Sequence, residues 1–146
     1  MNISGAIGID HGTKRTGFAV TDALRIHISP LGAFHGPGDD PGLIEHIATL
    51  LDERDVAVLV VGMPYNMDGS TGPRAESVLA FMRALSARFP KVEVLAHDER
   101  LSTKEAEELL RDSGLSAAKR RQQRDSWSAL VILQDWIRAG EPRPSR

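Results

Sequence analysis

The feature that most constrains the fold is an unbroken apolar run at residues 56–61, VAVLVV, which is rich in β-branched side chains. A short run without polar alternation is typical of a strand that is buried on both faces, as in parallel sheets. Residues 43–54, before this run, carry apolar side chains at helical spacing. After it, Gly72-Pro73 can begin a second helix, because proline is tolerated in the first helical turn. The sequence therefore predicts an α/β fold with crossover helices.

The residues before this unit have the pattern of an antiparallel sheet. Apolar runs at 6–9 and 17–21 flank the turn-like segment 12–15, and this arrangement predicts a hairpin. A third strand is expected within residues 26–34, ahead of a loop at 35–42 that is rich in glycine and proline. The first part of the chain therefore supplies three antiparallel strands.

The second half alternates helices and strands. A helix from Pro73 ends before Pro90, and we expect its apolar face to consist of Ala75, Val78, Leu79, Met82, Leu85 and Phe89. A strand follows at 92–96, then a helix whose start has capping-box spacing between Ser102 and Glu105, and a largely apolar helix at about 125–139. The whole order predicts a mixed sheet of about five strands, three antiparallel and then parallel crossovers, with helices on both faces.

Length and composition indicate one globular domain. We expect a single domain over residues 1–139 and a flexible tail at 140–146, since the chain has 146 residues and is 41% hydrophobic. The absence of cysteine excludes disulfides and thiolate metal sites. The first residues do not resemble a signal peptide, and no apolar run is long enough to span a membrane, so a cytoplasmic protein without a membrane partner is expected. A net charge of −2 means that any nucleic acid must bind to a local basic patch.

Acidic residues follow the predicted strands at the point where each strand ends. Asp10 comes directly after the first strand, and Asp98 and Glu99 come after the last one. If these strands are parallel, their carboxyl ends meet at one edge, which is where open α/β sheets bind ligands. Each acid also has a structural interpretation, because Asp10 can form a turn and Asp98 or Glu99 can cap a helix. Either member of the later pair can serve as the functional carboxylate.

Asp125 is the third acidic candidate. It begins the predicted last helix, where Ala129, Ile132 and Trp136 share its face, so we expect its carboxylate to point inward. An inward carboxylate needs a cation or a hydrogen-bonding partner, because burying it unpaired costs several kcal/mol or changes its protonation. A simple helix cap is the alternative interpretation.

Three converging carboxylates predict a divalent-metal site. Carboxylate oxygens are hard ligands that suit Mg²⁺ or Mn²⁺ and leave positions open for water and phosphate. Two ions roughly 3.5–4 Å apart would activate the attacking water and stabilise the leaving oxygen of a phosphodiester. The five histidines lack metal-ligand spacing and are expected to be structural or exposed, with His11 and His97 candidates by proximity alone.

Basic residues accompany these acids and are candidates for contact with a phosphate backbone. Arg100 has two interpretations, since it can pair with a neighbouring carboxylate or hold a phosphate. The loop at 66–72 can present amides to phosphate or can be a plain connecting turn. The candidate nucleic-acid-binding residues are Lys14, Arg15, Arg74, Arg100, Lys119, Arg120 and Arg121, with Arg124 beside the last group.

Four segments together resemble the YqgF/RuvX family of RNase H-like proteins, described as pre-16S ribosomal RNA nucleases or Holliday junction resolvases. The segments are residues 9–17 (IDHGTKRTG), 61–70 (VGMPYNMDGS), 98–103 (DERLST) and 125–134 (DSWSALVILQ). They occur in the family's order and span nearly the whole chain. Departures from the family pattern are His11 in place of an apolar residue, Thr16 in place of isoleucine, and Ser128-Ala129 in place of two alanines.

The resemblance implies an RNase H-like fold and a metal-dependent nuclease that matures the 5′ end of 16S ribosomal RNA. It assigns the carboxylate positions to Asp10, Glu99 and Asp125, and it favours Glu99 over Asp98. It also implies Mg²⁺ or Mn²⁺, with two ions expected, and nucleic acid as the partner of a monomer or homodimer.

Three other functions fit parts of the same pattern. A junction resolvase acting on four-way DNA would need a two-fold dimer to make paired cuts. A non-catalytic RNA-binding factor in ribosome assembly is compatible with the same fold, since fold does not determine activity. The loop that starts at Asp10 also resembles the first phosphate loop of actin-like ATPases, but those enzymes enclose nucleotide between two domains and this chain predicts one.

Overall fold

A computed structural model describes residues 4–101 and 123–143 of the chain. The predicted helix that starts at Ser102 and the basic residues Lys119, Arg120 and Arg121 lie outside this described part.

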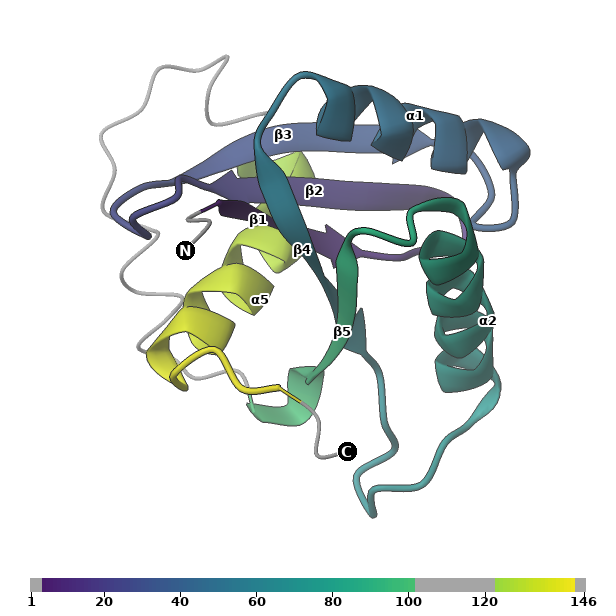
Figure 1. The fold of residues 1–146 in the computed structure, drawn as a ribbon. Helices are drawn as coiled ribbons and strands as arrows, with labels where there is room; N and C mark the ends of the chain where they lie inside the picture. The colour runs from purple at the N-terminus through teal and green to yellow at the C-terminus, as the bar shows by residue number, and fades with distance from the viewer. Residues whose placement is uncertain (1–3, 102–122, 144–146) are drawn as a thin grey trace.

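The centre of the molecule is one five-stranded sheet with the order β3-β2-β1-β4-β5 (Figure 1). The neighbours β1–β2 and β2–β3 are antiparallel, whereas β1–β4 and β4–β5 are parallel. This arrangement confirms the predicted mixed sheet with three antiparallel strands and parallel crossovers. The strands are β1 (Gly5–Asp10), β2 (Arg15–Thr21), β3 (Ile28–His35), β4 (Val56–Met63) and β5 (Glu93–Asp98).

Helices cover both faces of this sheet, as predicted. On one face lie α1 (Pro41–Asp52) and α2 (Pro73–Arg88), and on the other lies α5 (Trp127–Arg138) (Figure 1). The first helix begins inside the segment that we expected to be a loop. Asp40 is its N-cap, accepting a hydrogen bond from the Gly42 amide at 2.8 Å, and Pro41 occupies the first turn. The second helix begins at Pro73 with Gly72 as its N-cap residue, as expected.

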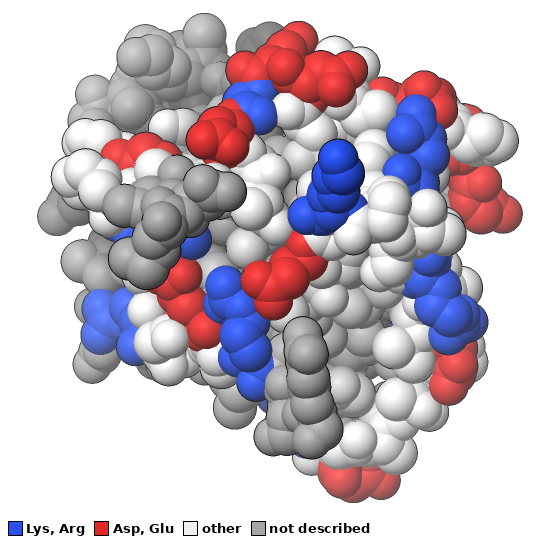
Figure 2. Space-filling view, viewed as in Figure 1, with Lys and Arg blue, Asp and Glu red and all other residues white. Residues whose placement is uncertain are grey.

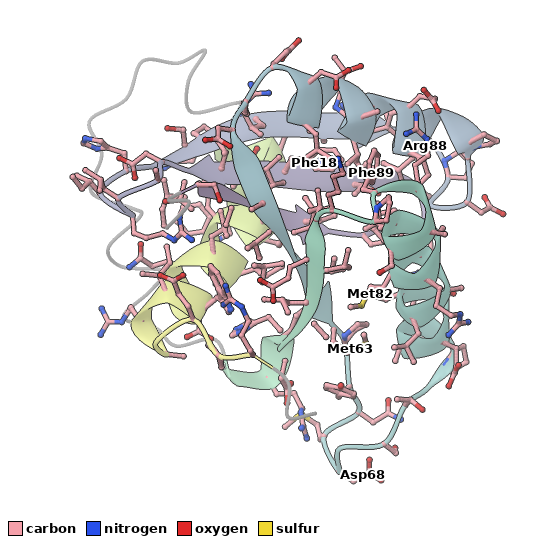
Figure 3. All side chains as sticks on the ribbon, viewed as in Figure 1. Phe18, Met63, Asp68, Met82, Arg88 and Phe89 are labelled. Carbon is pink, nitrogen blue, oxygen red and sulfur yellow. The ribbon has the colours of Figure 1, made fainter. Side chains whose placement is uncertain are left out.

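The face of α2 that packs on the sheet differs in part from the predicted one. Phe81 is buried there with Ala75, Val78 and Leu85, whereas Leu79, Met82 and Phe89 are partly buried. Positions 81 and 82 both continue a helical apolar stripe, so spacing does not distinguish them. In Figure 3 the side chains of Met63 and Met82 lie between the sheet and α2.

The chain after α5 is described as far as residue 143, and these residues contact the body of the protein. Glu141 pairs with Arg25 at 3.2 Å, and Arg143 pairs with Glu93 at 3.1 Å. The indole Nε1 of Trp136 donates to the Pro142 carbonyl at 3.3 Å. None of the helices in the described residues is long and apolar enough to cross a membrane.

Candidate active site

The carboxyl ends of β1, β4 and β5 meet at one edge of the sheet, as predicted. The parallel register pairs Ile9 with Val61 across β1 and β4, and Met63 with Asp98 across β4 and β5. Asp10, the last residue of β1, therefore lies beside the end of β4, close to Asp98 and the 3₁₀ turn η1 (Glu99–Leu101).

Asp10 is half-buried at this edge and faces α5. The Ser128 hydroxyl of α5 hydrogen-bonds its carboxyl group. Burial raises the pKa of Asp10 above its ordinary value. The Ser128 hydrogen bond and the positive charges of Arg74 and Arg15 lower this pKa, but their effect is smaller than that of burial. The positive charges of Arg74 and Arg15 favour the ionised form of Asp10, which is the form that can hold a metal ion.

Glu99 lies against the same edge over Gly62. A Cβ atom at Gly62 would overlap Oε1 of Glu99 and the end of the Ile132 side chain, so the missing side chain at Gly62 provides the space for this carboxylate. Burial raises the pKa of Glu99, and the negative charge of Asp10 raises it further. The charge of Asp10 thus opposes the ionisation of Glu99, and Arg74 acts on both groups.

Asp98 is engaged elsewhere. Its carboxylate accepts from Arg100 Nε at 3.0 Å and from Arg100 Nη2 at 2.7 Å, and this ion pair lowers the pKa of Asp98. Arg100 also donates to the backbone carbonyls of Asn66 and Met67 at 3.3 and 3.2 Å. Of the two interpretations of Arg100, the structure therefore contains the carboxylate pair, and this pair ties η1 to the loop after β4.

The structure places Asp125 differently from our expectation. Helix α5 begins at Trp127, so Asp125 lies before it and is not part of its face. Its side chain is 31% exposed and pairs with Arg15 Nη1 at 3.3 Å. The physical reason is Ser126, whose hydroxyl accepts from the Gly32 amide at 2.8 Å and thereby fixes the start of α5 against β3.

The structure thus brings two of the three predicted carboxylates into one pair and holds the third close by. Among residues 4–101 and 123–143, no group of three metal-binding side chains is already arranged as a metal site. Asp10 and Glu99 nevertheless fit a divalent cation, because they are hard oxygen donors and a bound cation would offset both the burial of the two groups and the repulsion of Glu99 by Asp10.

Arg74 is the cation most closely associated with the acidic pair. It lies in the first turn of α2, and its Nη2 donates to the His11 carbonyl at 2.6 Å. Its charge lowers the pKa of both Asp10 and Glu99. On the face seen in Figure 2, Lys and Arg side chains are interspersed with Asp and Glu, so that face is not uniformly basic. Phosphate contacts are therefore expected from individual arginines at the edge.

Several backbone amides of the loop at 66–72 donate hydrogen bonds to acceptors within the same loop. The Asn66 amide donates to the Ser70 carbonyl at 2.9 Å, and the Gly69 amide to the Asn66 carbonyl at 2.8 Å. The Ser70 amide donates to the Asp68 carboxylate at 2.9 Å. Gly69 has a φ of +87°, which favours glycine. These bonds favour the connecting turn over a phosphate cradle; Figure 3 shows Asp68 at its tip.

Both candidate histidines have structural partners. His11 is buried, stacks on Phe81 with ring centroids 4.3 Å apart, and bonds through Nε2 to the Gly38 carbonyl at 2.9 Å. Burial lowers the pKa of His11. His97 Nε2 lies 2.6 Å from Oδ2 of Asp135 in the core beneath α5.

Sequence reasoning missed Gly62 and Ser128 at the site, and Asp135 in the core beneath α5. Gly62 looked like the end of a strand, and Asp135 lay unnoticed in an apolar helix. Ser128 did give a signal, because it departs from the family pattern, and the structure shows that this hydroxyl bonds Asp10.

The raised pKa values of Asp10 and Glu99 predict how the stability of the metal-free protein depends on pH. Because the folded-state pKa values are above the ordinary 3.8 and 4.5, folding favours the protonated groups. Their stabilisation is present at low pH and is lost as pH rises from about 4.5 through the raised values. With EDTA present, urea unfolding between pH 4 and 7.5 should show a smaller loss of stability for Asp10→Asn/Glu99→Gln than for wild type. Equal pH dependence in both proteins would contradict the burial of this pair.

The sheet order and the acidic pair at its carboxyl edge define the class of the protein: it has the RNase H-like fold. The solved structure of Thermus thermophilus RuvC in complex with a Holliday junction substrate matches it with a TM-score of 0.62, covering 97% of this chain and 99% of that one at 19% identity. At that identity, the match establishes the fold alone.

Sequence comparison identifies the family. The model described as "RuvX: Holliday junction resolvase" matches residues 4–139, and the chain belongs to this family of phosphodiester-hydrolysing enzymes. A relative from Halalkalibacterium halodurans is 38% identical over 132 residues, covering 90% of this chain and 94% of its own. One from an Anaeromyxobacter species is 42% identical over 131 residues, with 90% and 94% covered. Both bear the name "Putative pre-16S rRNA nuclease".

Proposed function

We propose that this protein is a cytoplasmic nuclease that processes the 5′ end of precursor 16S ribosomal RNA, with divalent metal held by Asp10, Glu99 and Asp125. The observation that carries the proposal is the close pair of Asp10 and Glu99, two desolvated carboxylates at the carboxyl edge of an RNase H-like sheet. The names of the relatives support RNA as the substrate.

Each residue of the edge has a distinct task in this proposal. Bound Mg²⁺ or Mn²⁺, with two ions expected, would supply an activated water and stabilise the leaving oxygen. Asp10 and Glu99 hold the metal in their ionised forms, and Ser128 orients Asp10. Arg74 holds a phosphate oxygen near the pair.

Arg15 and Asp125 give the edge a way to respond to substrate. In the structure they neutralise each other at 3.3 Å, and the Arg15 side chain is 57% exposed. A phosphate that pairs with Arg15 would release Asp125, which then completes the carboxylate set. Exposed ion pairs are worth about 1 kcal/mol or less, so a phosphate can displace this one.

The test uses purified protein with labelled precursor RNA and with labelled four-way DNA, each in Mg²⁺, Mn²⁺ or EDTA. We expect the protein to cut the RNA near its mature 5′ end in Mg²⁺ or Mn²⁺ and not in EDTA. Cutting of the four-way DNA instead, in paired positions by a dimer, would establish the resolvase function that the family description favours. RNA binding without cleavage in any metal would overturn the nuclease proposal and leave a non-catalytic assembly factor.

Matched substitutions distinguish the roles of Glu99 and Asp98 in cleavage. Glu99→Gln should reduce cleavage by about 10³-fold, since losing a metal ligand removes several kcal/mol of transition-state stabilisation. Asp98→Asn should reduce it by about tenfold, because Asp98 supports the loop through Arg100 and not the metal. Single-turnover rates measured over a range of Mn²⁺ concentrations check this order, and a larger effect from Asp98→Asn would reverse the assignment.

A further inference from the structure

A groove of about 520 Å³ opens on the other side of the sheet edge from the acidic pair, between the start of α1 and α2. Its volume is within the range of small-ligand sites, and such sites are mainly apolar with a few polar groups. The floor and walls include Phe81, Ile44 and Pro41. On α2 the lining residues are small, namely Ser77, Ala80 and Ala84, which leaves the groove open.

The groove is adjacent to the candidate active site, because His11, the residue after Asp10, lines it. Asp10 and His11 are consecutive at the end of β1, and side chains alternate between the two faces of the sheet. Asp10 accordingly contacts Ser128 of α5, whereas His11 stacks on Phe81 of α2 and lines the groove. Arg74, which donates to the His11 carbonyl, lies one helical turn before Ser77. A nucleic-acid strand with one phosphate at the acidic pair can therefore place a neighbouring nucleotide over this groove.

The charge at the rim identifies the part of a nucleotide that fits. Asp39 and Asp40 line the groove, and a carboxylate repels a phosphate. Asp40 is occupied by the Gly42 amide, whereas Asp39 is exposed and makes no hydrogen bond or ion pair within the described residues. A free carboxylate accepts hydrogen bonds from base amino groups, such as N4 of cytosine. The apolar floor suits the face of a base ring.

We propose that this groove binds a nucleobase of the substrate strand adjacent to the cleaved phosphate, and that Asp39 selects a base with an amino group over uracil. The identity of the ligand, a nucleic-acid strand, rests on the proposed nuclease function. The test does not, because it measures binding and not cleavage. Base binding in the groove gives the enzyme a sequence preference that the phosphate contacts at the edge cannot supply.

The experiment measures binding, so that it does not depend on cleavage. Fluorescence anisotropy with EDTA present compares short labelled oligo-C, oligo-A and oligo-U RNAs. We expect wild type to bind oligo-C and oligo-A about tenfold more tightly than oligo-U, as one good base contact is worth more than about 1 kcal/mol. Equal binding of the three RNAs would overturn the proposal, as would displacement of the RNA from the groove by a second copy of the chain.

Two variants and one control locate the preference. Ala80→Leu fills the groove and should remove the preference, whereas Ala87→Leu makes the same change on α2 at an exposed position outside the groove and should retain it. Asp39→Asn, at an exposed residue, should shift binding toward oligo-U, because the amide can donate to the uracil O4. An unchanged preference in both Ala80→Leu and Asp39→Asn would overturn the proposal. If wild type shows the base preference but does not cleave RNA, the nuclease function alone is overturned.

Discussion

Asp10→Asn should lower the rate of cleavage by about 10³-fold or more, which corresponds to about 4 kcal/mol of transition-state stabilisation. The substitution removes one negative ligand of the proposed metal but keeps the shape of the side chain and its ability to bond Ser128. Nucleic-acid binding should stay intact or become stronger, because a charge that repels phosphate is lost. Single-turnover cleavage and anisotropy on the same RNA measure the two effects.

A matched control for this variant is Asp52→Asn. Asp52 is the exposed last residue of α1, remote from the carboxyl edge, and its substitution should leave cleavage unchanged. Misfolding is excluded as a cause if Asp10→Asn is at least as stable as wild type at pH 7 in EDTA, which the raised pKa of Asp10 predicts. Unchanged cleavage by pure Asp10→Asn protein would eliminate the metal mechanism.

The position of Asp10 was predictable because two simple rules agree there. The apolar run at 56–61 indicated a buried parallel strand, and parallel strands end at a common edge. An acid that directly follows such a strand then has a defined place, whatever the details of the packing. The same reasoning placed Asp98 and Glu99 together but did not separate them, because that choice depends on Arg100 and on the space above Gly62.

The place of Asp125 was not predictable from helix periodicity. The start of α5 is fixed by the hydrogen bonds between Ser126 and Gly32, two residues 94 positions apart in the sequence. A residue that precedes the helix does not follow its periodicity, so Asp125 need not share a face with the residues four and seven positions later. The last helix therefore begins two residues later than expected, and Asp125 lies beside β2, partly exposed and paired with the cation Arg15 near Asp10.

Asp135→Ala should reduce the free energy of unfolding by about 3 kcal/mol, since it leaves a buried histidine without its partner. The carboxylate of Asp135 lies 2.6 Å from His97 Nε2, and the two side chains are 8% and 3% exposed. Asp135→Asn should cost less, because the amide can still hydrogen-bond His97. Urea unfolding checks both values, and equal losses would contradict a specific role for this bond.

Variants of the His97–Asp135 pair can also separate an effect on stability from an effect on the position of Glu99, because His97 is two residues before Glu99. Replacing a buried polar pair by well-packed apolar residues is often neutral or stabilising. The double variant His97→Leu/Asp135→Leu should therefore recover much of the stability that Asp135→Ala loses. If the bond between β5 and α5 also holds Glu99 over Gly62, the stable double variant will still need a higher Mn²⁺ concentration for cleavage than wild type. Wild-type metal dependence in that variant would show that the pair stabilises the core and does not position Glu99.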